Sequence, residues 1–107
     1  MVSFEEFKKL SIKIAKIKEI KEHPNADKLY ILKIDLGNND EREVVAGIKK
    51  AYTIDELKDK LVAVVDNIAP VTIRGVESNG MILAANDGEK LAVISPDKEI
   101  SPGAVVK

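Results

Sequence analysis

The chain contains no cysteine, no tryptophan and a single histidine, and only 4% of its residues are aromatic. The lack of cysteine excludes disulfides, thiol nucleophiles and Cys-based zinc sites, and one histidine is too few for the usual metal clusters. Scarce aromatic side chains argue against a surface on which single-stranded nucleic acid stacks. No apolar run approaches the roughly 20 residues that span a bilayer, and the N-terminus lacks a secretory apolar segment. We therefore expect a cytoplasmic protein with no membrane partner.

Recognisable catalytic motifs are also missing. The sequence has no G-x-S-x-G motif, no phosphate-binding glycine loop and no acid pair with a plausible partner. His23 precedes a proline with no second metal ligand in reach, and the acidic segment 35–40 lacks the alternating ligands of an EF-hand. We expect no catalytic residue, no cofactor and no metal site.

The charge balance bears on nucleic-acid binding. Lys and Arg number 17 against 18 Asp and Glu, which gives a net charge of −1. Nucleic-acid binders are usually strongly basic, so any such binding has to come from a local patch. Basic residues gather along the first predicted strand and after the third: Lys13, Lys16, Lys18, Lys21, Lys49 and Lys50. They form either an electrostatic track or a solubilising face balanced by Glu19 and Glu22.

Hydrophobic periodicity and capping signals divide the 107 residues into short elements. Ser3 and Glu6 fit a capping box that opens an N-terminal helix within residues 1–10, and Thr53 and Glu56 fit a second one. Alternation predicts a first strand over 11–21 whose phase slips near Ala15, which indicates a β-bulge. Further strands are predicted at 28–36, 42–46, 61–66, 80–85 and 91–94, with an extended tail at 104–106.

Three strands, a helix and two more strands is the element order of the OB-fold, a five-stranded Greek-key barrel. We expect a single all-β domain with short helices over residues 1–107. Within it, residues 1–10 form the N-terminal helix, 11–88 the barrel and 89–107 a C-terminal strand extension.

The segment between the strands at 61–66 and 80–85 carries the most polar chemistry. We expect it to be a strand-to-strand connection and one wall of a nucleic-acid site. It presents a dense set of hydrogen-bonding side chains around the permissive Gly75 and Gly80, namely Arg74, Glu77, Ser78 and Asn79. Arg74 is either a bidentate phosphate ligand or an ion-paired loop residue. Met81 either packs against a sugar or base, or belongs to the barrel core.

Several dispersed motifs carry a resemblance to a known family. They are His23-Pro-Asn-Ala-Asp-Lys-Leu-Tyr30, Val45-Ala-Gly47, Pro70, and Arg74-Gly-Val-Glu-Ser-Asn-Gly-Met81 followed by Ile-Leu-Ala-Ala85. From about Ser11 to its end the chain resembles the tRNA-binding domain found at the C-terminus, or as the beta subunit, of many methionyl-tRNA synthetases. The same domain occurs as free-standing tRNA-binding proteins.

This resemblance implies an OB barrel with terminal additions, commonly a homodimer, that binds the corner of the tRNA L by shape. Carried over by position, it implies tRNA contacts by Lys28, Ser78 and Met81, joined by Asn25 and Arg74 from the same motifs. The slightly acidic net charge departs from what is expected of a tRNA-binding domain. It implies a modest affinity for tRNA unless two copies act together.

The function implied is a non-catalytic part of protein biosynthesis that tethers tRNA for a methionyl-tRNA synthetase. The sequence is compatible with a separate subunit or with the C-terminal domain of a longer synthetase. The alternative is a protein-interaction or chaperone-like module on the same barrel, which would bind unfolded peptides through an apolar groove. A small enzyme is disfavoured by the missing catalytic motifs.

Overall fold

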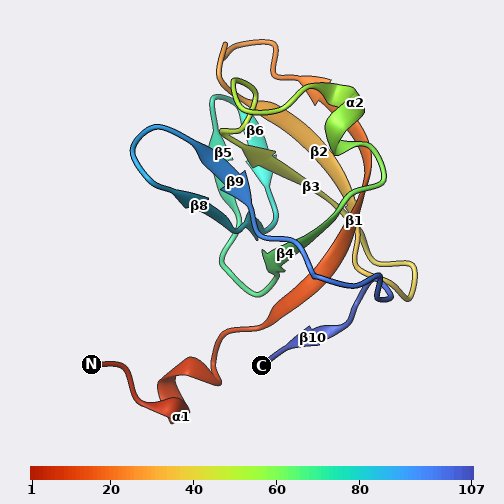
Figure 1. Ribbon diagram of the computed structural model, residues 1–107. Coiled ribbons are helices and arrows are strands. Elements are labelled where there is room, and N and C mark those ends of the chain that lie inside the picture. Colours follow the sequence, from red (N-terminus) through yellow and green to blue (C-terminus); the bar gives the residue numbers. More distant parts are fainter.

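The computed structural model describes residues 1–107, which form a small β-barrel with two short helices (Figure 1). The elements follow in the order α1 (Phe4–Phe7), β1 (Ile12–Glu22), β2 (Tyr30–Asp35), β3 (Glu41–Ala46), α2 (Ile54–Leu57), β4 (Leu61–Val65), β5 (Val71–Ile73), β6 (Val76–Ser78), β7 (Met81–Ile82), β8 (Ala84–Asn86), β9 (Leu91–Val93) and β10 (Val105–Val106).

The main sheet runs in the order β3-β2-β1-β4-β7, with β10 added beside β1. All of its strand pairs are antiparallel. The edge strands β3 and β7 come together, so the sheet curls into a nearly closed barrel. The expected OB-type barrel is confirmed.

Strand β1 bends because it has different partners along its length. Residues 12–16 pair with β4, and residues 16–22 pair with β2, with a register shift between Ile17 and Glu19. The predicted bulge is therefore confirmed, but it lies a few residues after Ala15. Ile14 and Ala15 are both buried although they are consecutive, as expected where a strand coils through a closed barrel.

The core fills the barrel and extends under α2. It is built from aliphatic side chains with Tyr30 as its one aromatic member: Ala15, Ile17, Tyr30, Leu32, Ile34, Leu36, Val44, Ala46, Ile48, Leu57, Val62, Val64 and Val93. The Tyr30 hydroxyl donates to the Tyr52 carbonyl at 2.8 Å, and the Tyr52 hydroxyl accepts from the Val93 amide at 2.9 Å. These bonds fix the segment before α2 and the strand β9 on the core.

Both predicted capping boxes are present, at Ser3 with Glu6 and at Thr53 with Glu56. The first helix nevertheless spans only Phe4–Phe7, shorter than the expected 1–10, and it buries no residue. A helix this short gains little without tertiary packing, and α1 stands apart from the barrel (Figure 1). Neither helix is long and apolar enough to cross a membrane.

The structure corrects two predictions about the second half of the chain. The expected connection between β4 and β7 contains a β-hairpin, β5–β6, which forms a separate two-stranded sheet. The strand predicted over 80–85 is divided into β7 and β8, because β7 pairs with β4 whereas β8 turns away to pair with β9. In each case strands only two or three residues long are too short to give a periodic signal.

The C-terminal segment is fastened to the first strand. The Gly103 amide donates to the Ile14 carbonyl at 2.7 Å, and the Ile14 amide donates to the Ala104 carbonyl at 2.9 Å. Gly103 has a φ of +93°, and a Cβ built there would lie 2.6 Å from the Leu36 carbonyl oxygen. Only glycine lets the C-terminal segment cross so close to the backbone of Leu36 without displacing the β2–β3 turn.

We predict that Gly103→Ala destabilises the fold more than Gly88→Ala does. Gly88 also has a positive φ, but a Cβ there meets nothing within 4 Å. In the control Gly88→Ala, the free energy of unfolding should fall by only about 1–2 kcal/mol, the cost of a positive φ in alanine. In Gly103→Ala it should fall further, because the added Cβ also has to push the C-terminal segment away from the β2–β3 turn. Thermal unfolding of both variants tests this, and equal losses would show that the close crossing is not a constraint on stability.

Candidate nucleic-acid interface

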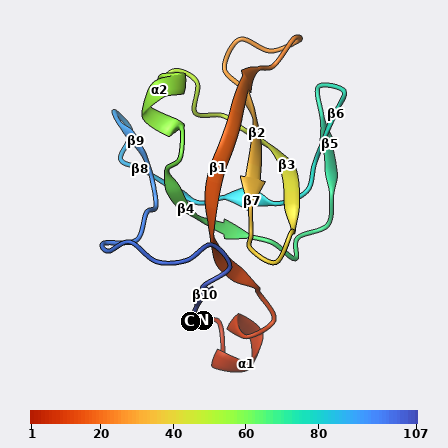
Figure 2. The same cartoon turned by 90° about the vertical axis from the view of Figure 1, so that its right-hand side faces the viewer.

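Three segments that are distant in sequence meet at one end of the barrel: the β1–β2 loop, the segment from Gly47 to Tyr52, and the β5–β6 turn. The Lys49 amide donates to the Lys28 carbonyl at 3.4 Å, which joins the first two. The His23 ring lies 3.0 Å from the Ile73 carbonyl oxygen, which joins the first and third. In Figure 2 the β1–β2 loop and the β5–β6 turn project from the end opposite both chain termini. We call this the loop end.

Three of the predicted site residues lie at the loop end. Asn25 and Lys28 are exposed on the β1–β2 loop, and Arg74 is exposed at the β5–β6 turn. Arg74 has a φ of +53° and is followed by Gly75 at +89°, so this tight turn holds the arginine in a strained backbone conformation. Neither Lys28 nor Arg74 forms an ion pair within the chain. Both charges are free for an anionic ligand.

Ser78 occupies a different position from these residues. Its side chain is 2% exposed, and its hydroxyl accepts from the Val45 amide at 2.9 Å and donates to the Gly80 carbonyl at 3.2 Å. The neighbouring Asn79 amide donates to the Glu43 carbonyl at 3.0 Å. These bonds give partners to the Val45 amide and the Glu43 carbonyl on the edge of β3, where the barrel has no continuous strand ladder. Ser78 and Asn79 therefore close the barrel.

Gly80 and Met81 complete this seam. Gly80 has a φ of +151°, and a Cβ there would lie 3.3 Å from Val44 and from the Val65 carbonyl oxygen. Its lack of a side chain therefore serves barrel packing. Met81 is 44% exposed, which excludes it from the barrel core. It pairs with Val65 across β7 and β4, away from the three loops.

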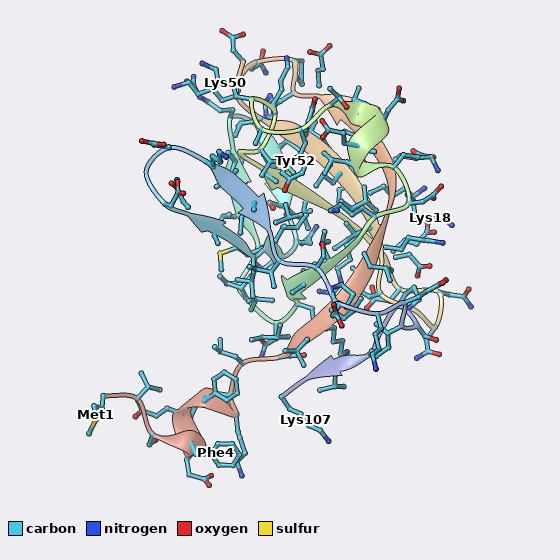
Figure 3. The ribbon with its side chains drawn as sticks, in the orientation of Figure 1. Met1, Phe4, Lys18, Lys50, Tyr52 and Lys107 are labelled. Atoms are coloured by element: carbon cyan, nitrogen blue, oxygen red, sulfur yellow. The ribbon has the colours of Figure 1, made fainter.

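The lysines divide into paired and unpaired groups. Lys13 pairs with Asp66 at 3.1 Å, Lys21 pairs with Glu43 at 3.8 Å, and Lys49 pairs with Glu22. The hydrogen bond from Lys49 to Glu22 raises the pKa of this ammonium group. Lys50, next in sequence, has no ionic partner and extends at the loop end, whereas Lys18 lies on the flank of the barrel (Figure 3). The sequence identified the pair Lys49–Lys50 but gave no means of telling the two lysines apart.

The surface hollows differ in charge. The largest, of about 720 Å³, is lined by four carboxylates and one arginine: Glu41, Glu43, Asp66, Glu77 and Arg42. Its arginine is engaged by Asp40, whose hydrogen bond raises the pKa of the guanidinium. A second hollow of about 510 Å³ has Lys50 and Lys90 on its walls, with Glu89 as its one carboxylate. A polyanion is repelled from the first hollow and attracted toward the second.

The arrangement at the loop end is suited to binding a shaped anion. Lys28, Lys50 and Arg74 are exposed and come from three different segments, which backbone and side-chain hydrogen bonds bring to one end of the barrel. Sequence reasoning assigned His23 only a role in loop structure, because its partner Ile73 is 50 residues away. No cluster of His, Cys, Asp or Glu side chains is arranged to hold a metal ion.

Comparison with known proteins agrees with the binding of a polyanion. Residues 12–105 match the family described as "Putative tRNA binding domain". The methionine–tRNA ligase of Pyrococcus furiosus is 55% identical over 106 residues, which make up 99% of this chain but 14% of that ligase. The match is to the C-terminal region of such ligases. The chain therefore spans only a small fraction of these relatives.

Two solved structures have the same fold over the whole chain. A MetRS-related protein from Pyrococcus horikoshii superposes with a TM-score of 0.92 at 32% identity, covering 100% of this chain and 98% of that one. The CsaA chaperone protein from Picrophilus torridus superposes with a TM-score of 0.92 at 30% identity, with 100% of both chains covered. The fold thus occurs in a synthetase-related protein and in a chaperone.

We predict that Ser78→Ala lowers the free energy of unfolding by about 1–3 kcal/mol, because it leaves the buried Val45 amide without a partner. Ser101→Ala is the matched control, since Ser101 is exposed and its hydroxyl makes no hydrogen bond. Thermal unfolding and hydrogen exchange of the Val45 amide measure the effect. Unchanged stability and exchange would show that the serine does not close the barrel.

Proposed function

The chain belongs to the family of tRNA-binding domains, and from this premise we propose that it holds tRNA for the catalytic part of a methionyl-tRNA synthetase in the cytoplasm. The family is non-catalytic. The observation that carries the proposal is the gathering of unpaired Lys28, Lys50 and Arg74 at the loop end. The 55% identity to a methionine–tRNA ligase supports the choice of synthetase.

Recognition is proposed to depend on the shape of the tRNA, at the corner of the L. The deep groove of A-form RNA is closed to side chains, so a protein reads structured RNA by phosphates, sugars and unstacked bases. Cations carried on three separate segments of one rigid barrel can together match phosphates of one folded RNA better than those of a flexible strand. The aromatic stacking that single strands require is missing from the loop end, where no aromatic residue is fully exposed and the acidic Asp27 stands beside Lys28.

The functional effect is proximity. A tRNA held by this domain has a raised effective concentration at a catalytic domain that is linked to it or associated with it. A modest affinity is enough for this purpose, which fits a chain whose net charge is −1.

The site residues have distinct proposed roles. Lys28, Lys50 and Arg74 contact phosphates, and Asn25 donates to a phosphate or a ribose hydroxyl from the same loop as Lys28. Met81, on β7 away from the three loops, is proposed to offer an exposed apolar contact to a base or sugar of RNA that extends beyond the loop end. Ser78 is proposed to act indirectly, because its hydroxyl is occupied by Val45 and Gly80.

We further propose a homodimer formed through the terminal end of the molecule. Phe4 is 70% exposed, Leu10 52% and Val105 66%. Helix α1 and strand β10, which carry Phe4 and Val105, lie beside the two termini at the end opposite the loop end (Figure 2). Such an unpartnered apolar cluster is typical of an interaction surface. Pairing there leaves both loop ends open, so one dimer presents two basic sites.

The second candidate function is peptide binding, favoured by the similarity to a CsaA chaperone protein. It would use apolar rather than charged contacts, and its binding would depend weakly on salt.

Binding of tRNA at several salt concentrations, with an unstructured RNA of equal length as competitor, tests the proposal. We expect folded tRNA to bind with a steep salt dependence and the competitor to displace it poorly. Equal binding of both RNAs, or of neither, would contradict tRNA recognition and favour the peptide-binding function.

We predict that Lys50→Ala weakens tRNA binding and reduces the salt slope by about one unit or less, as expected for loss of one phosphate contact. Arg74→Ala and Lys28→Ala should behave in the same way. Lys49→Ala is the matched control, because Glu22 already neutralises that ammonium group. If Lys49→Ala reduces the slope as much as Lys50→Ala does, the distinction between paired and unpaired lysines is wrong.

We predict a dimer in sedimentation at micromolar concentration, and a monomer for the double variant Phe4→Ser with Val105→Ser. The control is Val71→Ser, which changes a valine that is 53% exposed on β5 rather than at the terminal end. A monomeric unmodified chain, or a dimer that survives the double change, would overturn this part of the proposal.

A further inference from the structure

Only two polar side chains are buried in this chain, and both join the β5–β6 hairpin to the rest of the molecule. They are His23, which is 4% exposed, and Ser78, which is 2% exposed. The hairpin makes no ladder pairing with the barrel sheet, and most of its strand residues are exposed or half-buried. Ser78 and the adjacent Asn79 amide hold the end of β6 against β3, so the turn end of the hairpin depends on the bond from His23.

Both ring nitrogens of His23 are used. The Asn25 amide donates to Nδ1 at 3.0 Å, and Nε2 lies 3.0 Å from the Ile73 carbonyl oxygen. A backbone amide only donates and a carbonyl only accepts, so Nδ1 carries the lone pair and Nε2 carries the proton. The ring is thereby fixed as the neutral Nε2–H tautomer, with one hydrogen bond within its own loop and one to the hairpin.

These two bonds end beside residues of the proposed tRNA site. Asn25 carries one partner atom, and Ile73 directly precedes Arg74, whose backbone is strained at a φ of +53°. A strained turn on a hairpin outside the barrel sheet holds its geometry only if the surrounding structure fixes it. His23 is the one side chain with hydrogen bonds to both the β1–β2 loop and the hairpin.

We propose that His23 is a positioning residue for tRNA binding, which fixes the β1–β2 loop and the β5–β6 turn relative to each other so that Asn25, Lys28 and Arg74 face one RNA. This inference rests on the proposed function. His23 itself is buried and makes no contact with the RNA.

Two conservative substitutions separate its two hydrogen bonds. Asn in His23→Asn places an oxygen near the position of Nδ1 and keeps the bond from the Asn25 amide, but it is too short to reach Ile73. Gln in His23→Gln places an amide nitrogen near the position of Nε2 and keeps the bond to the Ile73 carbonyl. We expect His23→Asn to weaken tRNA binding about tenfold and His23→Gln to stay within about threefold of the unmodified chain.

A double-mutant cycle with Arg74→Ala distinguishes positioning from general destabilisation. If His23 acts through Arg74, the effect of His23→Asn on tRNA affinity shrinks in the Arg74→Ala background, whereas it persists in the background of the exposed, remote Lys98→Ala. Additive effects of His23→Asn and Arg74→Ala would overturn the proposal, as would equal losses in the Asn and Gln variants.

Amide resonances of the free chain give a readout that needs no RNA. The resonances of Arg74 and Gly75 should shift in His23→Asn and stay near their original positions in His23→Gln, with Lys98 unaffected in both. Unshifted resonances would overturn the role of His23 in fixing the turn. If the unmodified chain fails to bind tRNA, the proposed function fails, and these resonances alone decide whether His23 holds the hairpin.

Discussion

The seam between β3 and β7 is the constraint on which the rest of the structure depends. Five antiparallel strands curl until two edges face each other, and the edge of β3 is then satisfied by the Ser78 hydroxyl and the Asn79 amide instead of a full strand ladder. Gly80 lets the chain pass between Val44 and Val65 at this point. Closing the barrel in this way leaves β5–β6 outside the sheet, so the hairpin is free to carry Arg74 toward the loop end.

A chain with a net charge of −1 needs a local group of unpaired cations to bind a polyanion. Carboxylates pair with Lys13 and Lys21 on β1 and line the largest hollow, whereas Lys28, Lys50 and Arg74 at the loop end have no ion-pair partner. Apolar side chains occupy the opposite end around the termini. We propose that the loop end binds RNA and that the terminal end binds a second copy of the chain.

The sequence predicted features that depend on neighbouring residues or on long periodic runs. Both capping boxes, the bulge in β1 and the element order of the barrel are local signals, and the structure confirms them. The hairpin β5–β6 was missed because its strands are only three residues long. The roles of His23 and Ser78 depend on partners 50 and 33 residues away, which no spacing rule indicates. Lys49 and Lys50 differ only through the fold, which brings Glu22 to one of them.

The loop end is the surface that we propose meets tRNA. Titrating the isotope-labelled chain with tRNA and following its amide resonances tests this proposal. We expect perturbations to gather in the β1–β2 loop, in residues 47–52 and at the β5–β6 turn, and the resonances of the hollow beside Arg42 and of helix α1 to stay unchanged. Perturbations centred on α1 and β10, or spread evenly over the barrel, would contradict it.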